Sequence, residues 1–197
     1  MRFSDALTPI LGSATKLRLL RAMFGSPDRR WTGRELARST LVSAAQAARD
    51  LSQLADTSLV EREVIGRSYS WRLNYRHVLW PVLAGLFREE SDLRPGLIRE
   101  LASGLVPAKV ERARLFGSIP RGDERADSDI DLFLEVRDAG GKARAEEAID
   151  RFRSRLWERY GNPVSALIYT RAEVAHPRNP TLLKAIEEEG FGVVGGE

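Results

Sequence analysis

The sequence predicts an α+β protein built from two modules, and three observations lead to this fold class. The first 75 residues contain three helical patterns followed by two strand-like runs around a turn. From residue 97 to residue 189, strand-like and helical runs alternate. Between these regions, residues 91–96 read Ser-Asp-Leu-Arg-Pro-Gly, a composition typical of a linker. We therefore expect one module over residues 1–91 and a second over residues 92–197.

The composition is that of a globular protein with unevenly placed charge. Hydrophobic residues make up 43% of the 197 residues, no run is long enough for a membrane span, and the first residues do not resemble a signal peptide. The lack of cysteine excludes disulfides, thiolate zinc sites and cysteine nucleophiles. Residues 1–92 hold 14 Lys and Arg against 10 Asp and Glu, whereas the rest hold 17 against 18. We expect a cytoplasmic protein without a membrane partner, whose basic first module is suited to nucleic acid.

Three helices and a hairpin account for the first module. Ser13, Thr32 and Ser43 are good N-cap residues, and Glu35 completes a capping box with Thr32. Two strand-like runs flank a Gly-Arg turn at residues 66–67, as in a hairpin. The expected elements are helices over residues 13–24, 33–39 and 43–55 and strands over residues 60–65 and 68–73. This order of elements is that of a winged helix-turn-helix.

A family resemblance in this module depends on the run Gly33-Arg34-Glu35-Leu36-Ala37, the leucines at 51 and 54, and the run Leu59-Val60-Glu61-Arg62. Over roughly residues 10 to 75, the chain resembles MarR- and ArsR-like regulator domains. The resemblance implies double-stranded DNA as a partner, with the third helix in the major groove. The candidate DNA-binding residues are Ser43, Gln46 and Arg49 on this helix and Arg67 at the hairpin tip. The alternative is a winged helix that contacts only protein.

The module departs from the usual regulator pattern at two turns. The tight turn between the second and third helices commonly holds Gly, but here it reads Thr40-Leu41. After the third helix Gly is usual before Leu-Val, and this chain has Ser58. A non-glycine residue at positive φ costs roughly 1 kcal/mol, which the fold can tolerate.

The segment that follows the hairpin predicts a further helix over residues 76–90. Val78, Val82, Leu83, Leu86 and Phe87 are among the residues that form one broad apolar stripe. Such a stripe usually packs within its own chain. The alternative is a helix that pairs with a second copy in a homodimer.

The second module predicts a small mixed sheet with helices on one side. Glycines at 140 and 141 separate the second strand from a long helix, and Pro180 and Gly190 mark the start and end of the last helix. The expected elements are helices over residues 97–104, 121–126, 143–159 and 180–189 and strands over residues 112–117, 129–136 and 164–169.

A pair of short motifs in this module points to chemistry. Gly117 and Ser118 form a small turn after the first strand, where backbone N–H groups can approach a phosphate closely. Asp129 and Asp131 are two positions apart, so on a strand both side chains lie on one face. Mg²⁺ is commonly held by one or two carboxylates together with substrate phosphates. Metal-assisted handling of a nucleoside triphosphate needs both parts.

The same residues, with Arg121-Gly122, Ser128 and Leu132, resemble the signature of polymerase-beta-like minimal nucleotidyltransferases over roughly residues 96 to 192. The resemblance implies that Gly117, Ser118 and Arg121 bind the nucleotide, with ATP the expected one. It also implies that Asp129 and Asp131 are the catalytic residues and hold Mg²⁺. Minimal nucleotidyltransferases of this kind are often antitoxins that modify a partner toxin.

The family pattern includes a third carboxylate on the next strand, and here Ser165 matches that position. A serine hydroxyl stays protonated at neutral pH and supplies no charge to a metal. Glu173, just beyond the strand end, would have to reach back to replace it. Two functions therefore stay open. One is transfer of a nucleoside monophosphate to a protein or small acceptor, and the other is a catalytically silent regulator that senses nucleotide or binds a partner protein.

Overall fold

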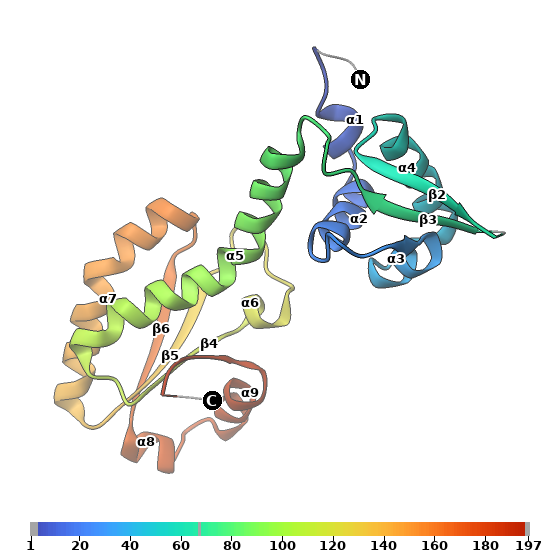
Figure 1. Ribbon diagram of the computed structural model, residues 1–197. Helices are drawn as coiled ribbons and strands as arrows, with labels where there is room; N and C mark the ends of the chain where they lie inside the picture. The colour runs from blue at the N-terminus through green and yellow to red at the C-terminus, as the bar shows by residue number, and fades with distance from the viewer. Residues whose placement is uncertain (1–3, 67, 196–197) are drawn as a thin grey trace. The chain divides into compact units, whose positions relative to one another are not determined.

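The computed structural model describes residues 4–66 and 68–195, so Arg67 lies outside the described residues. The chain divides into two compact units, Met1–Leu93 and Arg94–Glu197. Figure 1 shows both units along the coloured chain. No helix in the described part of the chain is long and apolar enough to cross a membrane.

The first unit consists of helices followed by a hairpin, in the order of a winged helix-turn-helix. Its elements are α1 (Thr8–Leu11), α2 (Ala14–Phe24), β1 (Trp31–Thr32), α3 (Gly33–Ser39), α4 (Ala44–Asp56), β2 (Val60–Ile65), β3 (Ser68–Leu73) and the first part of α5 (Trp80–Leu105). The three strands pair antiparallel in the order β1-β3-β2. The three predicted helices and the hairpin are confirmed.

Side-chain caps start the helices where the sequence predicts them. The Ser13 hydroxyl accepts a hydrogen bond from the backbone of α2 at 3.1 Å, and Ser43 caps α4 in the same way at 3.2 Å. At α3, the Thr32 hydroxyl accepts from the Glu35 N–H while the Glu35 carboxylate accepts from the Thr32 N–H. Each cap satisfies N–H groups that the first helical turn leaves unpaired.

The first part of α5 has two apolar faces rather than one broad stripe. Leu83 and Phe87 are buried in the core of the first unit, and Phe87 stacks on Phe24 with 4.7 Å between ring centroids. Val82 and Leu86, by contrast, are exposed. The predicted stripe therefore packs within its own chain along the side that carries Leu83 and Phe87, while Val82 and Leu86 on the neighbouring side stay exposed.

The segment predicted as a linker, residues 91–96, does hold the division between the two units, but it is helical, since α5 continues through it from Trp80 to Leu105. Pro95 inside a helix removes one backbone hydrogen bond and costs about 3 kcal/mol. Leu97, Leu101 and Leu105 are buried in the core of the second unit. Each buried leucine contributes about 1.5–3 kcal/mol. The free energy gained by burying these leucines outweighs the local cost of the proline. The proline and glycine in the sequence indicate only the cost, so the continuous helix could not be predicted from them.

The two turns that lack the usual glycine adopt left-handed backbone. Leu41, between α3 and α4, has φ 55°, and Ser58, after α4, has φ 65°. The Leu41 side chain is 89% exposed, so it contributes little packing to offset the strain. The prediction that these positions hold non-glycine residues at positive φ is confirmed.

Replacing either residue with glycine should stabilise the first unit. We expect Leu41→Gly and Ser58→Gly each to raise the free energy of unfolding by about 0.5–1 kcal/mol, because relief of left-handed strain exceeds the added entropy of the unfolded chain. Urea denaturation measures the change. Thr40→Gly is the matched control, since Thr40 has φ −104° and its hydroxyl donates to Leu36 O at 2.6 Å. That control should lower stability, and stabilisation by all three would contradict the explanation.

The second unit is a four-stranded sheet with helices on both faces. Beyond α5, its elements are η1 (Val106–Ala108), β4 (Arg112–Phe116), α6 (Ser118–Arg121), β5 (Ile130–Val136), α7 (Ala139–Tyr160), β6 (Val164–Thr170), α8 (Arg171–Ala175), α9 (Pro180–Glu189) and β7 (Phe191–Val194). The strand order is β6-β5-β4-β7, with β5 and β6 parallel and the other pairs antiparallel. The mixed sheet is confirmed, and β7 is an additional strand.

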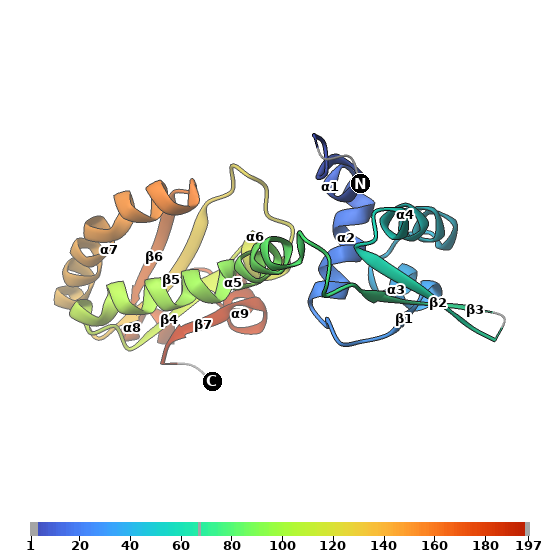
Figure 2. The same cartoon turned by 45° about the horizontal axis from the view of Figure 1, so that its top comes forward.

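Two predicted features of this unit are wrong. A helix was expected over residues 121–126, but α6 ends at Arg121 because Gly122 takes a left-handed conformation with φ 71°. Helices were expected on one side of the sheet only. In the structure, α5 and α7 cover one face, and Ile186 of α9 packs against Phe133 on the other. Figure 2 shows α5, α7 and α9 around the sheet. The second face is the one that carries the polar motifs.

Candidate functional site

The polar motifs meet at one end of the sheet of the second unit. Phe116 of β4 pairs with Asp131 of β5, and Asp131 pairs with Ser165 of β6. These three side chains form a row on one face, because directly paired residues point the same way. Asp131 is half-buried, while Ser165 and Asp129 are exposed. The two aspartates therefore stand at an open end of the sheet.

Gly117 allows the turn after β4 to lie directly against Asp131. Its φ is 81°, and a Cβ placed on it would lie 2.2 Å from Asp131 Oδ2. Any other residue would strain the backbone, and its Cβ would displace the Asp131 carboxylate from this position. The close neighbour of this glycine is a side chain of the site itself, which the sequence did not indicate, and the predicted approach of the turn to a phosphate stays a prediction.

The segment that leads into β5 is held by hydrogen bonds that the sequence did not indicate. Asn162 donates its side-chain N–H to Ser128 O at 2.8 Å, and Arg125 N donates to the Ser128 hydroxyl at 2.9 Å. Ile130 N donates to Pro163 O at 2.8 Å. These contacts position Asp129 directly before β5, which begins at Ile130 and not at residue 129 as predicted. Asn162 was missed because no local pattern marks a long-range side-chain contact.

Arg121 and the two aspartates form one electrostatic group. Burial and the neighbouring Asp129 carboxylate raise the pKa of Asp131 above its ordinary value, and the Arg121 guanidinium partly offsets the shift. Arg121 also lies 3.2 Å from Asp123 and 3.9 Å from Glu189, and about half of its side chain is exposed. A buried carboxylate beside another carboxylate is destabilised in its charged form, which a cation would relieve.

Removing the charge of Asp131 should therefore stabilise the metal-free protein. Because the pKa is higher in the folded state than in the unfolded state, the charged carboxylate destabilises the fold above that pKa. The penalty disappears as the pH falls below the unfolded value. We expect Asp131→Asn to raise the melting temperature at pH 7 in EDTA and the gain to shrink in acid. Thermal unfolding followed by circular dichroism measures this, with the exposed Asp127→Asn as a control that should not shift the melting temperature.

Glu173 does not replace the missing third carboxylate. It follows the C-terminal end of β6, whereas Ser165 is the second residue of this seven-residue strand, roughly 17 Å from Thr170 at 3.3 Å per residue. Its carboxylate pairs with Lys142 at 2.6 Å and completes a capping box with Thr170. The Lys142 and Thr170 hydrogen bonds lower the pKa of Glu173 to about 2. The strand direction excludes Glu173 from the site.

The donor set at this end of the sheet fits a hard cation shared with a phosphate ligand. Within residues 4–66 and 68–195, no group of three or more His, Asp or Glu is arranged to hold a metal. Asp129 and Asp131 alone leave most of the six positions of Mg²⁺ to other oxygens. Mg²⁺ keeps waters and takes phosphate oxygens readily, so two carboxylates suit a magnesium–phosphate complex.

The candidate DNA-binding residues of the first unit lie together on the first half of α4. Ser43 is the exposed N-cap, and the Arg49 guanidinium donates to Gln46 Oε1 at 2.5 Å. Arg49 is exposed, while Ala47, Leu51 and Leu54 face the core. Arg67, the fourth candidate, lies outside the described residues. The three described candidates thus share the solvent side of one helix.

Comparison with known families agrees with the geometry of the second unit. Residues 97–190 match the family model described as the nucleotidyltransferase domain. The second unit is a nucleotidyltransferase domain. The match spans the Gly-Ser turn, both aspartates and Ser165, so the residues at this end of the sheet lie in the matched region. No curated protein matches the chain.

Several solved structures share distant likeness with the chain. A possible transcriptional regulator from Methanosarcina mazei Go1 is 14% identical with a TM-score of 0.34, covering 49% of this chain and 85% of its own. NadR in complex with 4-hydroxyphenylacetate is 19% identical with a TM-score of 0.39, covering 51% and 70%. TrmBL2, an archaeal chromatin protein, is 16% identical with a TM-score of 0.28, covering 93% and 75%.

Proposed function

We propose that the nucleotidyltransferase domain binds a magnesium–nucleoside triphosphate complex and that the first unit binds double-stranded DNA. The observation that carries the nucleotide proposal is the convergence of Gly117, Asp129, Asp131 and Arg121 at one open end of the sheet. A turn that only glycine can make lies against a carboxylate whose charge is disfavoured without a cation. This arrangement is explained by a ligand that brings both positive charge and phosphate oxygens.

Each residue of the site has a distinct part in the proposed binding. Asp129 and Asp131 would hold Mg²⁺, which when bound neutralises charge on the triphosphate. The Gly117-Ser118 turn would present backbone N–H groups of the first turn of α6 to a phosphate. Arg121, half-exposed beside the aspartates, would contact a second phosphate. ATP is the nucleotide that we expect to bind.

Titration of the full chain with a fluorescent ATP analogue tests the proposal directly. Binding should require Mg²⁺ and should be reversed by EDTA, because the aspartates repel a free triphosphate. Unlabelled GTP and CTP in competition would define the preferred base. No binding of any nucleotide at millimolar Mg²⁺ would reject the proposed function of this domain.

Ser165 favours a nucleotide-binding regulator over an active transferase. The second candidate function is transfer of a nucleoside monophosphate to a protein, such as a partner toxin, or to a small acceptor, as the family resemblance implies. The exposed Ser165 hydroxyl stands beside Asp131 at the position where a carboxylate would add charge. Incubation with ATP labelled at the α-phosphate distinguishes the two, since a regulator leaves both itself and the product of an adjacent gene unlabelled.

DNA binding by α4 predicts a specific loss in one variant. Arg49→Ala should weaken binding to the protein's own upstream DNA by about five- to a hundredfold, the range for one base or phosphate contact. Fluorescence anisotropy at fixed salt measures the affinity. Arg153→Ala is the matched control, because it removes the same charge from an exposed helix of the second unit. Failure of the intact protein to bind this DNA would reject the DNA proposal, and an unchanged Arg49→Ala would remove this residue from it.

A further inference from the structure

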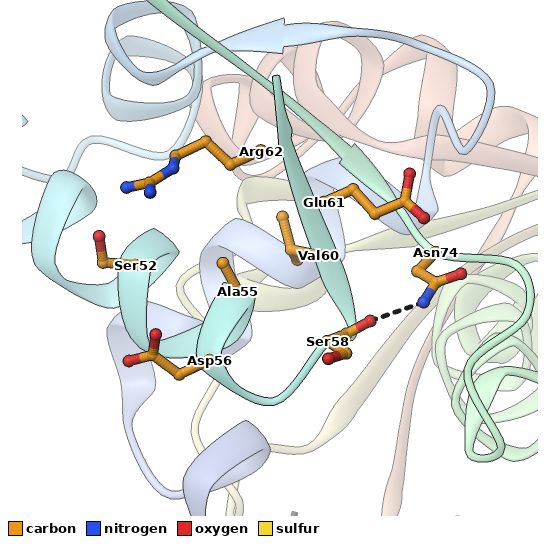
Figure 3. A pocket seen from close by; sticks show the side chains of 8 residues that line it. All are labelled: Ser52, Ala55, Asp56, Ser58, Val60, Glu61, Arg62 and Asn74. Atoms are coloured by element: carbon orange, nitrogen blue, oxygen red, sulfur yellow. Dashed lines mark hydrogen bonds between the residues drawn. The ribbon is translucent and has the colours of Figure 1, made fainter. Parts of the chain in front are cut away.

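The first unit contains a polar pocket that neither proposed activity uses. It lies between the second half of α4 and the start of β2 and has a volume of about 550 Å³, within the range of small-molecule sites. Figure 3 shows the side chains that line it. They are Ser52, Ala55, Asp56, Ser58, Val60, Glu61, Arg62 and Asn74.

The pocket carries a negative charge at Asp56 and a positive charge at Arg62, on two different elements. Figure 3 shows Arg62 reaching from β2 toward the side of α4 that carries Ser52, while Asp56 lies near the end of that helix. Both charged residues are exposed. Neither forms an ion pair with any residue in the described part of the chain. Glu61 differs, because its carboxylate lies 2.6 Å from Arg72. The pocket therefore offers one anion and one cation that have no ion-pair partner among the described residues.

The remaining contacts hold the pocket in shape and make its wall polar. The Arg62 guanidinium lies 4.6 Å from the centre of the Tyr69 ring, a cation–π contact that restricts its direction. Asn74 donates its side-chain N–H to Ser58 O at 2.8 Å, which closes one end. The Ser52 hydroxyl lies one helical turn before Asp56. Hydroxyls and charges outnumber apolar groups here, so the pocket suits a small polar ligand.

We propose that this pocket binds a small zwitterion, with its ammonium group at Asp56 and its carboxylate at Arg62. An ammonium group satisfies a carboxylate and nearby hydroxyls as a triple donor, and a carboxylate matches the fork of a guanidinium. A DNA phosphate would also satisfy Arg62. The Asp56 carboxylate repels a polyanion, however, so DNA fits the pocket less well than a ligand that carries both charges.

A series of ω-amino carboxylates tests the proposal and measures the span between the two charges. Glycine, β-alanine, 4-aminobutyrate, 5-aminopentanoate and 6-aminohexanoate are titrated into the full chain, with backbone amide shifts of α4 and β2 followed by NMR. One chain length should bind best. Propylamine and propionate, which carry one charge each, should bind at least tenfold more weakly than that member.

Variants at the two charges complete the experiment. Asp56→Asn and Arg62→Gln should each weaken binding of the best member at least tenfold, and both are surface changes that should leave the melting temperature unchanged. Gln53→Ala, an exposed change on α4 outside the pocket, should bind as the parent does. No shift with any member at 20 mM, or equal binding by all three variants, would overturn the proposal. The proposal would also be overturned if the protein bound no zwitterion while Arg62→Gln weakened DNA binding and Asp56→Asn strengthened it. That result would assign the pocket to DNA.

Discussion

Replacing both aspartates, Asp129→Asn with Asp131→Asn, should abolish magnesium-dependent nucleotide binding. Asparagine keeps the shape of each side chain but removes the charge that a hard cation needs. We expect an affinity loss of at least about 100-fold, equivalent to about 2.7 kcal/mol at 25 °C. The fluorescent ATP titration measures it. The loss should occur in a protein at least as stable as the parent, because the pKa of Asp131 is raised by burial and by Asp129 and the charge is therefore unfavourable without metal.

A control variant distinguishes loss of the binding site from a general effect of removing a carboxylate nearby. Asp127→Asn removes an exposed carboxylate from the same segment without touching the sheet, and should bind nucleotide as the parent does. If the double variant bound MgATP as tightly as the parent, the nucleotide would bind elsewhere, and the assignment of this end of the sheet would be wrong.

The second large effect is a gain of activity from Ser165→Asp. The position is directly paired with Asp131 on the neighbouring parallel strand, on the same face, and exposed. A carboxylate there would join two others at the site where we place Mg²⁺, and could also accept a proton from an attacking hydroxyl. We expect pyrophosphate release from ATP, with the nucleoside monophosphate transferred to water or to a hydroxyl of the protein, to rise at least about tenfold over the parent, a barrier reduction of about 1.4 kcal/mol. A coupled pyrophosphate assay at saturating MgATP measures the rate.

Two comparisons make the result interpretable. Ser165→Asn adds the same bulk without charge and should leave the rate at the parent level. Three neighbouring carboxylates should also lower the melting temperature of Ser165→Asp in EDTA, and Mg²⁺ should raise it again. This response shows whether the new carboxylate lies at the metal site, even if the variant has no turnover. A parent protein that already releases pyrophosphate as fast as the variant would show that Ser165 does not limit the chemistry.

Much of the local structure could be predicted because its causes are local. The caps at Ser13, Thr32 and Ser43, the hairpin after α4 and the left-handed backbone at Leu41 and Ser58 each follow from a few adjacent residues. The α5 helix was mispredicted for the opposite reason. A proline and a glycine indicate a break, and only burial of leucines in the second core keeps the helix continuous.

By itself, the sequence predicted which residues bind a metal and a phosphate, because residue type and a spacing of two on an expected strand place Asp129 and Asp131 together. Only the tertiary structure decided their neighbours. Strand register places Ser165 beside Asp131, strand direction puts Glu173 at the far end of β6, and a 2.2 Å Cβ approach requires glycine at 117. Register and direction depend on how strands far apart in the sequence pair with each other. The spacing of residues along one strand carries no information about that pairing.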